Sequence, residues 1–281
     1  MIVIGLQMDI AWEDPAKNYR KVEEMAQAAM EALDSSSTSS GPDDPKGSDL
    51  DPRLLVLPEM FATGFSMDGE KVSGFADETR GFLSDLASRL SAFVLGGYAE
   101  PADPLPANAC SIFAPTGQEV LHFRKLHPFS LAKEGKHYVG GETLETVELG
   151  GVRVTPLICY DLRFPEPFRP AAIDTDLFCV IANWPDKRRE AWSALLRARA
   201  IENQAFVLGV NRVGMAGNHS HAGDSVLVDP MGEVTAEVDA YGEAVVWGQV
   251  DPKEVTRVRR HLSFLKDRRP GLYHRLEESR S

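Results

Sequence analysis

Three side chains that could together catalyse acyl transfer each stand at the end of an expected strand. Glu59 follows the apolar run at residues 54–57, and Cys159 directly follows a run that ends at residue 158. Lys125 comes directly after residues 122–124, at the end of an expected strand. Ligands of layered α/β proteins bind at the carboxyl ends of strands. We therefore expect Glu59, Lys125 and Cys159 to converge on one site.

These residue types would suffice for amide hydrolysis without a metal or a cofactor. A buried carboxylate can take the proton of a thiol, and an ammonium group can stabilise the oxyanion that forms when a carbonyl is attacked. Backbone N–H groups at a strand-to-helix turn favour a thiolate, so we expect a lowered pKa and rapid alkylation for Cys159. The alternative interpretations are a turn carboxylate, a surface lysine and a buried inert cysteine, which is also our expectation for Cys110 and Cys179.

The composition indicates a protein with an ample core that does not bind polyanions. The 281 residues are 43% hydrophobic and carry a formal net charge of −12, which argues against nucleic acid or an anionic membrane as the partner. Three cysteines without paired spacing predict a reducing compartment, and we expect a cytoplasmic location. The apolar N-terminus is interpreted as a first strand, not a signal peptide, and no apolar run is long enough to span a bilayer.

The order of apolar patterns predicts a layered α/β protein with a mixed sheet, in one domain over residues 1–281. Helical spacing indicates helices at 15–33, 82–90 and 192–203 and a charged helix from 252. The Ser-rich segment 34–52 has almost no apolar residues and is predicted to be a mobile surface loop. Strands are expected at 2–8, 54–57, 93–97, 108–114, 119–125, 144–149, 152–158, 177–182, 205–210, 225–229, 233–238 and 245–250.

The chain resembles the nitrilase, or carbon–nitrogen hydrolase, superfamily, and within it the omega-amidases that act on 2-oxo acid amides. No single motif is specific, but their order and spacing are, and they cover nearly the whole chain. The matching segments are residues 57–61 (LPEMF), 63–67 (TGFSM), 124–125 (RK), 158–165 (ICYDLRFP), 182–185 (ANWP), 198–204 (ARAIENQ), 223–225 (GDS) and 229–230 (DP).

The resemblance implies a four-layer αββα sandwich and a role for each matching residue. Glu59 is the implied proton acceptor, Lys125 the oxyanion stabiliser and Cys159 the nucleophile. Glu134, which we would otherwise interpret as an exposed loop charge, is the implied supporting carboxylate, and the backbone N–H of Tyr160 is the second oxyanion donor. The resemblance also implies a homodimer or larger homo-oligomer, with contacts through the helix after Cys159 and the helix at 192–203.

The implied substrate is the monoamide of a small 2-oxo dicarboxylic acid. Tyr160 and Asp161 follow the cysteine, whereas the nitrile-hydrolysing branch typically has Trp and Glu there. A distant substrate carboxylate needs a cation, for which Arg188 is the candidate and a solvated charge run the alternative. Phe65 and Trp184 are the expected pocket walls.

Several alternatives remain open from the sequence. The substrate could be another small amide or an N-carbamoyl compound, and the scaffold could be a non-catalytic binding module. Arg163 is expected to form a structural ion pair with Asp161 or Glu166. The histidines at 219 and 221 with Asp224 invite a metal site, but no standard ligand spacing supports one, and we expect no metal.

Overall fold

Two six-stranded sheets form the centre of the protein. The computed structural model describes residues 1–37 and 51–279. The first sheet has the order β14-β1-β2-β3-β4-β5, in which β2 runs parallel to β1 and β3 while the outer pairs are antiparallel. Its strands are β1 (Ile2–Gln7), β2 (Arg53–Val56), β3 (Phe93–Glu100), β4 (Ala107–Phe113), β5 (Glu119–Arg124) and β14 (Ala244–Gln249).

The second sheet has the order β13-β12-β9-β8-β7-β6. Its central strands β7, β8 and β9 are parallel, and antiparallel strands flank them on both sides. The carboxyl ends of these three strands therefore lie at one edge of the sheet. The strands are β6 (Val147–Leu149), β7 (Val152–Ile158), β8 (Leu177–Ala182), β9 (Phe206–Asn211), β12 (Val226–Val228) and β13 (Val234–Glu237).

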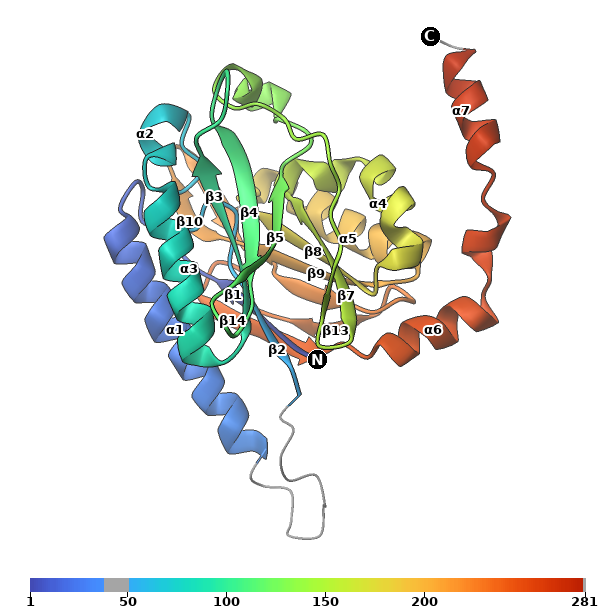
Figure 1. Cartoon of the computed structure of the whole chain (residues 1–281), viewed down its shortest axis with the longest axis horizontal. Coiled ribbons are helices and arrows are strands. Elements are labelled where there is room, and N and C mark those ends of the chain that lie inside the picture. Colours follow the sequence, from blue (N-terminus) through green and yellow to red (C-terminus); the bar gives the residue numbers. More distant parts are fainter. Residues whose placement is uncertain (38–50, 280–281) are drawn as a thin grey trace.

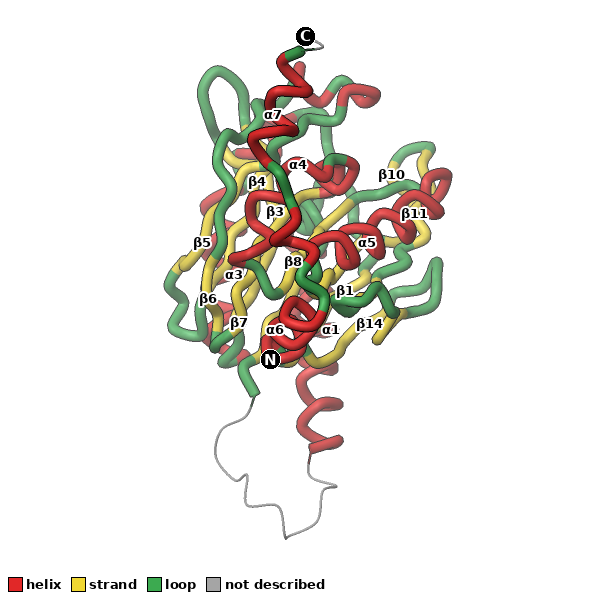
Figure 2. The backbone as a smooth tube through the Cα atoms, turned by 90° about the vertical axis from the view of Figure 1, so that its right-hand side faces the viewer, coloured by secondary structure: helices red, strands yellow, loops and turns green. Residues whose placement is uncertain are grey.

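Helices cover the outer face of each sheet, which makes four layers (Figures 1 and 2). Helices α1 (Pro15–Ser37) and α3 (Ala76–Leu90) pack on the first sheet. Helix α5 (Arg189–Asn203) packs on the second sheet, with α4 (Pro165–Ala171) beside it. The predicted αββα sandwich is confirmed.

Strand β2 shows how the sequence builds these layers. Side chains alternate between the two faces of a strand, so a strand with both faces covered is apolar throughout. Leu54 and Val56 point into the core between the two sheets, whereas Leu55 and Leu57 point into the core under α1 and α3. Because both faces of β2 are buried, every side chain of the run at 54–57 has to be apolar.

Most predicted elements are present, although several bounds differ and some elements were not predicted; helix α3, for example, begins at Ala76 and not at residue 82. Helix α1 continues to Ser37, so residues 34–37 are helical. Of the rest of the predicted loop, residues 51–52 belong to no helix or strand, and residues 38–50 lie outside the described residues. Strand β6 is shorter than the predicted strand at 144–149. An unpredicted hairpin of β10 (Val213–Ala216) and β11 (His219–Ala222) follows β9.

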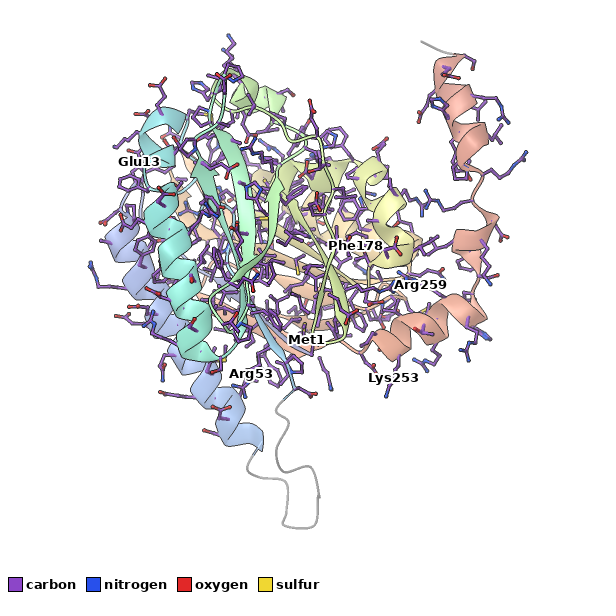
Figure 3. The ribbon with its side chains drawn as sticks, viewed as in Figure 1. Met1, Glu13, Arg53, Phe178, Lys253 and Arg259 are labelled. Carbon is purple, nitrogen blue, oxygen red and sulfur yellow. The ribbon has the colours of Figure 1, made fainter. Side chains whose placement is uncertain are left out.

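The C-terminal segment runs along the body and then extends away from it (Figure 1). In α6 (Pro252–His261), Arg259 points toward the body and donates to the carbonyls of Ala172 and Thr175, whereas Lys253 lies on the outer side (Figure 3). Helix α7 (Pro270–Glu278) has no buried residue. Across the described part of the chain, no helix combines the length and the apolar character needed to cross a lipid bilayer.

Candidate active site

Four strand ends bring polar side chains to one point between the two sheets. Glu59 follows β2 and Lys125 follows β5, and both strands end at the same edge of the first sheet. Cys159 and Asn183 follow the parallel strands β7 and β8 of the second sheet. Lys125 Nζ lies 3.0 Å from Glu59 Oε1 and lines the same cavity as Cys159. The predicted convergence of Glu59, Lys125 and Cys159 is confirmed.

Glu59 is fully buried and held by two asparagines that sequence analysis did not single out. Asn108 Nδ2 donates to Glu59 Oε1 at 2.7 Å, and the backbone N–H of Asn183 donates to Glu59 Oε2 at 2.8 Å. The Asn183 side chain in turn donates to the Glu59 backbone carbonyl. Gly97 permits this packing, because a Cβ there would lie 3.0 Å from the Glu59 Cα. Asn183 lies in the motif at 182–185, whereas nothing in the sequence distinguishes Asn108.

Glu134 lies in the short helix η2 (Glu134–Lys136) and is also fully buried. Its carboxylate accepts hydrogen bonds from Lys125 Nζ at 3.0 and 3.1 Å, and from Asn108 Nδ2 at 3.2 Å. The backbone N–H of Phe129 donates to it as well. The interpretation as an exposed loop charge is therefore wrong, and the position implied by the family resemblance agrees with the geometry.

The buried site combines two carboxylates with one ammonium group. Burial alone would lower the pKa of Lys125, but the negative charges of Glu59 and Glu134 outweigh it and raise that pKa, so the lysine is an ammonium at neutral pH. Burial, reinforced by the charge of Glu59, raises the pKa of the Cys159 thiol despite Lys125. The prediction of a lowered pKa for Cys159 is therefore wrong. A resting thiol needs a base, and Glu59 is in place to be one.

The backbone presents Cys159 at a sharp turn. Cys159 begins the short helix η3 (Cys159–Arg163) with φ of +48°, in the left-handed region that a residue with a Cβ rarely adopts. Such strain persists where the surroundings enforce it and is typical of functional sites. The N–H of Tyr160 lies in the first turn of η3, where N–H groups have no partner within the helix and are free to bind an oxyanion.

The site opens into a cavity of about 580 Å³ with mostly apolar walls. Aromatic side chains line it together with the ends of several polar residues, a composition typical of small-molecule sites. The lining residues are Trp12, Phe65, Met67, Lys125, Phe129, Ala132, Cys159, Tyr160, Arg163, Asn183, Trp184, Pro185, Arg188, Ala216, Gly217, Asn218, His219 and His221.

The residues predicted to bind substrate all line this cavity. The Phe65 ring lies 5.0 Å from Lys125 Nζ, and the buried Trp184 donates its Nε1–H to the backbone carbonyl of Arg188. Arg188 belongs to the short helix η5 (Asp186–Arg188), and its guanidinium lies 4.9 Å from the ring of Phe129. A cation on an aromatic face keeps its N–H donors available to a ligand.

Arg163 does not form the structural ion pair that was predicted for it. Its guanidinium lies 4.8 Å from the Trp184 ring and lines the cavity, and no ion pair with Asp161 or Glu166 exists in the described part of the chain. Asp161 is used otherwise, because it accepts from the backbone N–H groups of Ile158 and His127. Both Arg163 and Arg188 thus reach the cavity, and within residues 1–37 and 51–279 neither pairs with a carboxylate.

The unpredicted β10–β11 hairpin supplies another wall of the cavity. His219 and His221 line it, whereas Asp224 forms an ion pair with Arg189 at 2.7 Å. No group of three potential metal ligands occurs among the described residues. The remaining cysteines, Cys110 and Cys179, are buried in the core between the sheets as predicted.

Comparison with known proteins gives one family. The family model described as carbon-nitrogen hydrolase matches residues 5–260. An omega-amidase, YafV of Escherichia coli strain K12, is 42% identical over 190 residues, which cover 67% of this chain and 73% of that protein.

Two further relatives match nearly the whole chain. A 2-oxoglutaramate amidase of Bacillus subtilis strain 168 is 31% identical over 274 residues, covering 95% of this chain and 97% of the relative. The crystal structure of XC1258 from Xanthomonas campestris, a CN-hydrolase superfamily protein with an arsenic adduct in its active site, superposes with a TM-score of 0.81 at 32% identity. The superposition covers 96% of this chain and 97% of XC1258.

Proposed function

The chain belongs to the carbon–nitrogen hydrolase family and is an amidase of that family, and we propose that its substrate is the monoamide of a small 2-oxo dicarboxylic acid, 2-oxoglutaramate or 2-oxosuccinamate. The observation that carries the proposal is the buried Glu59–Lys125–Glu134 cluster, which lies beside Cys159 at a cavity that two guanidinium groups reach. The two relatives named as an omega-amidase and a 2-oxoglutaramate amidase support the choice of substrate.

In the proposed mechanism, Glu59 takes the thiol proton as Cys159 Sγ attacks the amide carbon. Lys125 and the backbone N–H of Tyr160 stabilise the oxyanion of the tetrahedral intermediate. Glu59 then gives its proton to the amide nitrogen, and the carbon–nitrogen bond breaks. Ammonia is released, and the acyl group remains on Cys159 as a thioester.

Hydrolysis of the thioester uses the same groups a second time, with water in place of the thiol as the nucleophile. Glu59 takes a proton from water, the hydroxide attacks the thioester carbonyl, and Lys125 and the Tyr160 N–H again stabilise the oxyanion. The carbon–sulfur bond breaks, the acid is released, and the proton held by Glu59 returns to Cys159. Glu134 and Asn108 take no proton; they hold Lys125 and Glu59 in place.

The two arginines explain why the substrate carries a distant carboxylate. A guanidinium binds a carboxylate with two parallel hydrogen bonds. Arg188 and Arg163 lie in cavity walls that are otherwise mostly apolar, and carboxylate partners for them are absent from the described residues. An anionic substrate end would neutralise them, whereas a fully apolar amide would leave them unpaired.

We expect wild-type enzyme to release ammonia from 2-oxoglutaramate or 2-oxosuccinamate at least tenfold more efficiently than from glutamine, butyramide, an N-carbamoyl amino acid or a nitrile. An Arg188→Gln variant should raise KM for the preferred substrate roughly 10- to 100-fold, the effect of losing a hydrogen bond to a charged group. The measurement is steady-state kinetics of ammonia release over this panel.

The matched control is Lys187→Gln, which removes the adjacent cation of η5, an exposed side chain outside the cavity wall. It should leave KM within twofold of wild type. Turnover of only the carbamoyl compound or the nitrile would reject the proposed substrate. If folded protein hydrolysed no compound of the panel, a non-catalytic binding module would become the better interpretation.

We further propose a cytoplasmic homodimer in which the C-terminal segment contributes to the contact. The segment exposes Phe264, Tyr273 and Leu276, and Ile173 after α4 and Ile201 in α5 are exposed as well. Residues 252–279 carry eight Lys or Arg against four Asp or Glu, in a chain with net charge −12. A basic, partly apolar segment fits the acidic surface of a second copy.

A Leu276→Glu substitution should weaken the dimer roughly 10- to 100-fold, because it replaces an exposed leucine that the proposed contact would bury. The measurement is molar mass by light scattering over a dilution series, in low and high salt. An exposed control, Glu278→Gln, should not change the mass. A wild-type monomer at all concentrations, or a Leu276→Glu dimer as tight as wild type, would contradict this assembly.

A further inference from the structure

His221 is the buried side chain of the cavity wall that the mechanism above leaves without a role. It lies on β11 opposite Gly214 of β10, is 3% exposed, and lines the cavity that contains Cys159. Its Nδ1 atom has no hydrogen-bond partner among the described residues. A buried polar side chain calls for an explanation, and an imidazole in the wall of a ligand cavity is placed to hydrogen-bond a ligand group.

The surroundings of His221 select a neutral ligand group. Burial, together with the charge of Arg212, lowers the pKa of His221 to about 4, although nearby backbone carbonyls of Gly214 and His219 oppose the shift. At neutral pH the ring is uncharged, with one N–H donor and one acceptor nitrogen. A carbonyl oxygen only accepts hydrogen bonds, so the one N–H of a neutral imidazole can donate to it, and the uncharged ring does not attract a carboxylate.

The position of His221 next to the helix that carries Arg188 matches the position of the 2-oxo group next to the substrate carboxylate. Strand β11 packs directly against η5, the helix that carries Arg188. In a 2-oxo acid, the carbonyl at carbon 2 is bonded to the carboxylate carbon, so the groups that bind these two substituents must be neighbours. Arg188 on η5 can bind the carboxylate, and His221 on the neighbouring strand β11 can donate to the adjacent 2-oxo oxygen.

We propose that His221 forms a subsite that hydrogen-bonds the 2-oxo oxygen of the substrate through its imidazole, beside the carboxylate subsite of Arg188. The inference rests on the proposed function and deepens it, because it explains how the enzyme distinguishes a 2-oxo acid amide from the same amide without the oxo group. A site built to hydrogen-bond a substrate group discriminates against analogues that lack it, since its own polar atom is then left unpaired.

The test compares 2-oxoglutaramate with glutaramate, which keeps the terminal amide and the carboxylate but lacks the 2-oxo group. For wild-type enzyme we expect kcat/KM to be at least tenfold higher for 2-oxoglutaramate. In His221→Phe, kcat/KM for 2-oxoglutaramate should fall roughly tenfold, the effect of one hydrogen bond between neutral groups, while glutaramate changes less than twofold. His221→Asn keeps a donor and should recover part of the preference.

The outcomes separate this subsite from the proposed function. Equal wild-type activity on the two substrates, or equal losses on both in His221→Phe, would overturn the subsite and leave the amidase assignment standing. Activity on neither, with turnover of another compound of the panel, would overturn the proposed substrate and the subsite with it. If His221→Phe does not fold, as judged by circular dichroism, the wild-type ratio and the His221→Asn variant still decide the question.

Discussion

Replacing Cys159 by alanine should abolish amide hydrolysis and leave the fold intact. The proposed mechanism has no path to ammonia without a covalent bond to Sγ, so we expect kcat to fall by at least about 1,000-fold, in line with the loss of a catalytic nucleophile. Stability should change little or increase, because the replacement also removes a polar atom from beside Glu59. The measurements are ammonia release from 2-oxoglutaramate and urea unfolding.

Cys179→Ala is the matched control for this experiment. Cys179 lies on β8, fully buried between the sheets, and does not line the cavity. Its replacement should retain wild-type kcat, with at most a modest loss of stability from the small cavity left behind. Mass spectrometry should detect an acyl adduct on Cys159 in wild type and Cys179→Ala, and none in Cys159→Ala. Near-wild-type turnover by Cys159→Ala would reject the nucleophile assignment.

The parts of the fold and site that depend on local pattern could be predicted from the sequence. Continuous apolar runs such as residues 54–57 and 177–182 identify strands with two covered faces. Glu59 and Cys159 follow such runs within two residues, and Lys125 follows the strand pattern at 119–124. That places Glu59, Lys125 and Cys159 at strand ends. The αββα order of layers came from the family resemblance, because periodicity does not determine strand order.

Features that depend on contacts between distant residues could not be predicted in this way. The raised pKa of Cys159 results from burial and from Glu59, a hundred residues earlier in the chain. Arg163 lies on Trp184 because two strand ends of the second sheet meet there. The β10–β11 hairpin has no alternation of apolar residues, so its strands, and with them His221, resembled a Gly- and Asn-rich loop.

Replacing Lys125 by methionine should reduce both activity and stability, for two separable reasons. The cluster has net charge −1, with Glu59 and Glu134 sharing one ammonium group at 3.0 Å. Without Lys125, two buried carboxylates face each other unpaired, and we expect a loss of about 3–5 kcal/mol in the free energy of unfolding. Loss of an oxyanion donor should also lower kcat at least about 100-fold.

The double variant Lys125→Met with Glu134→Gln distinguishes the two effects. It restores the net charge of the cluster to −1, because only the Glu59 carboxylate remains, so much of the lost stability should return. Activity should not return, since neither methionine nor glutamine provides an ammonium group for the oxyanion. Urea unfolding and ammonia release would be measured for both variants. Recovered activity in the double variant would mean that Lys125 acts only by neutralising Glu134, and that the Tyr160 N–H stabilises the oxyanion without it.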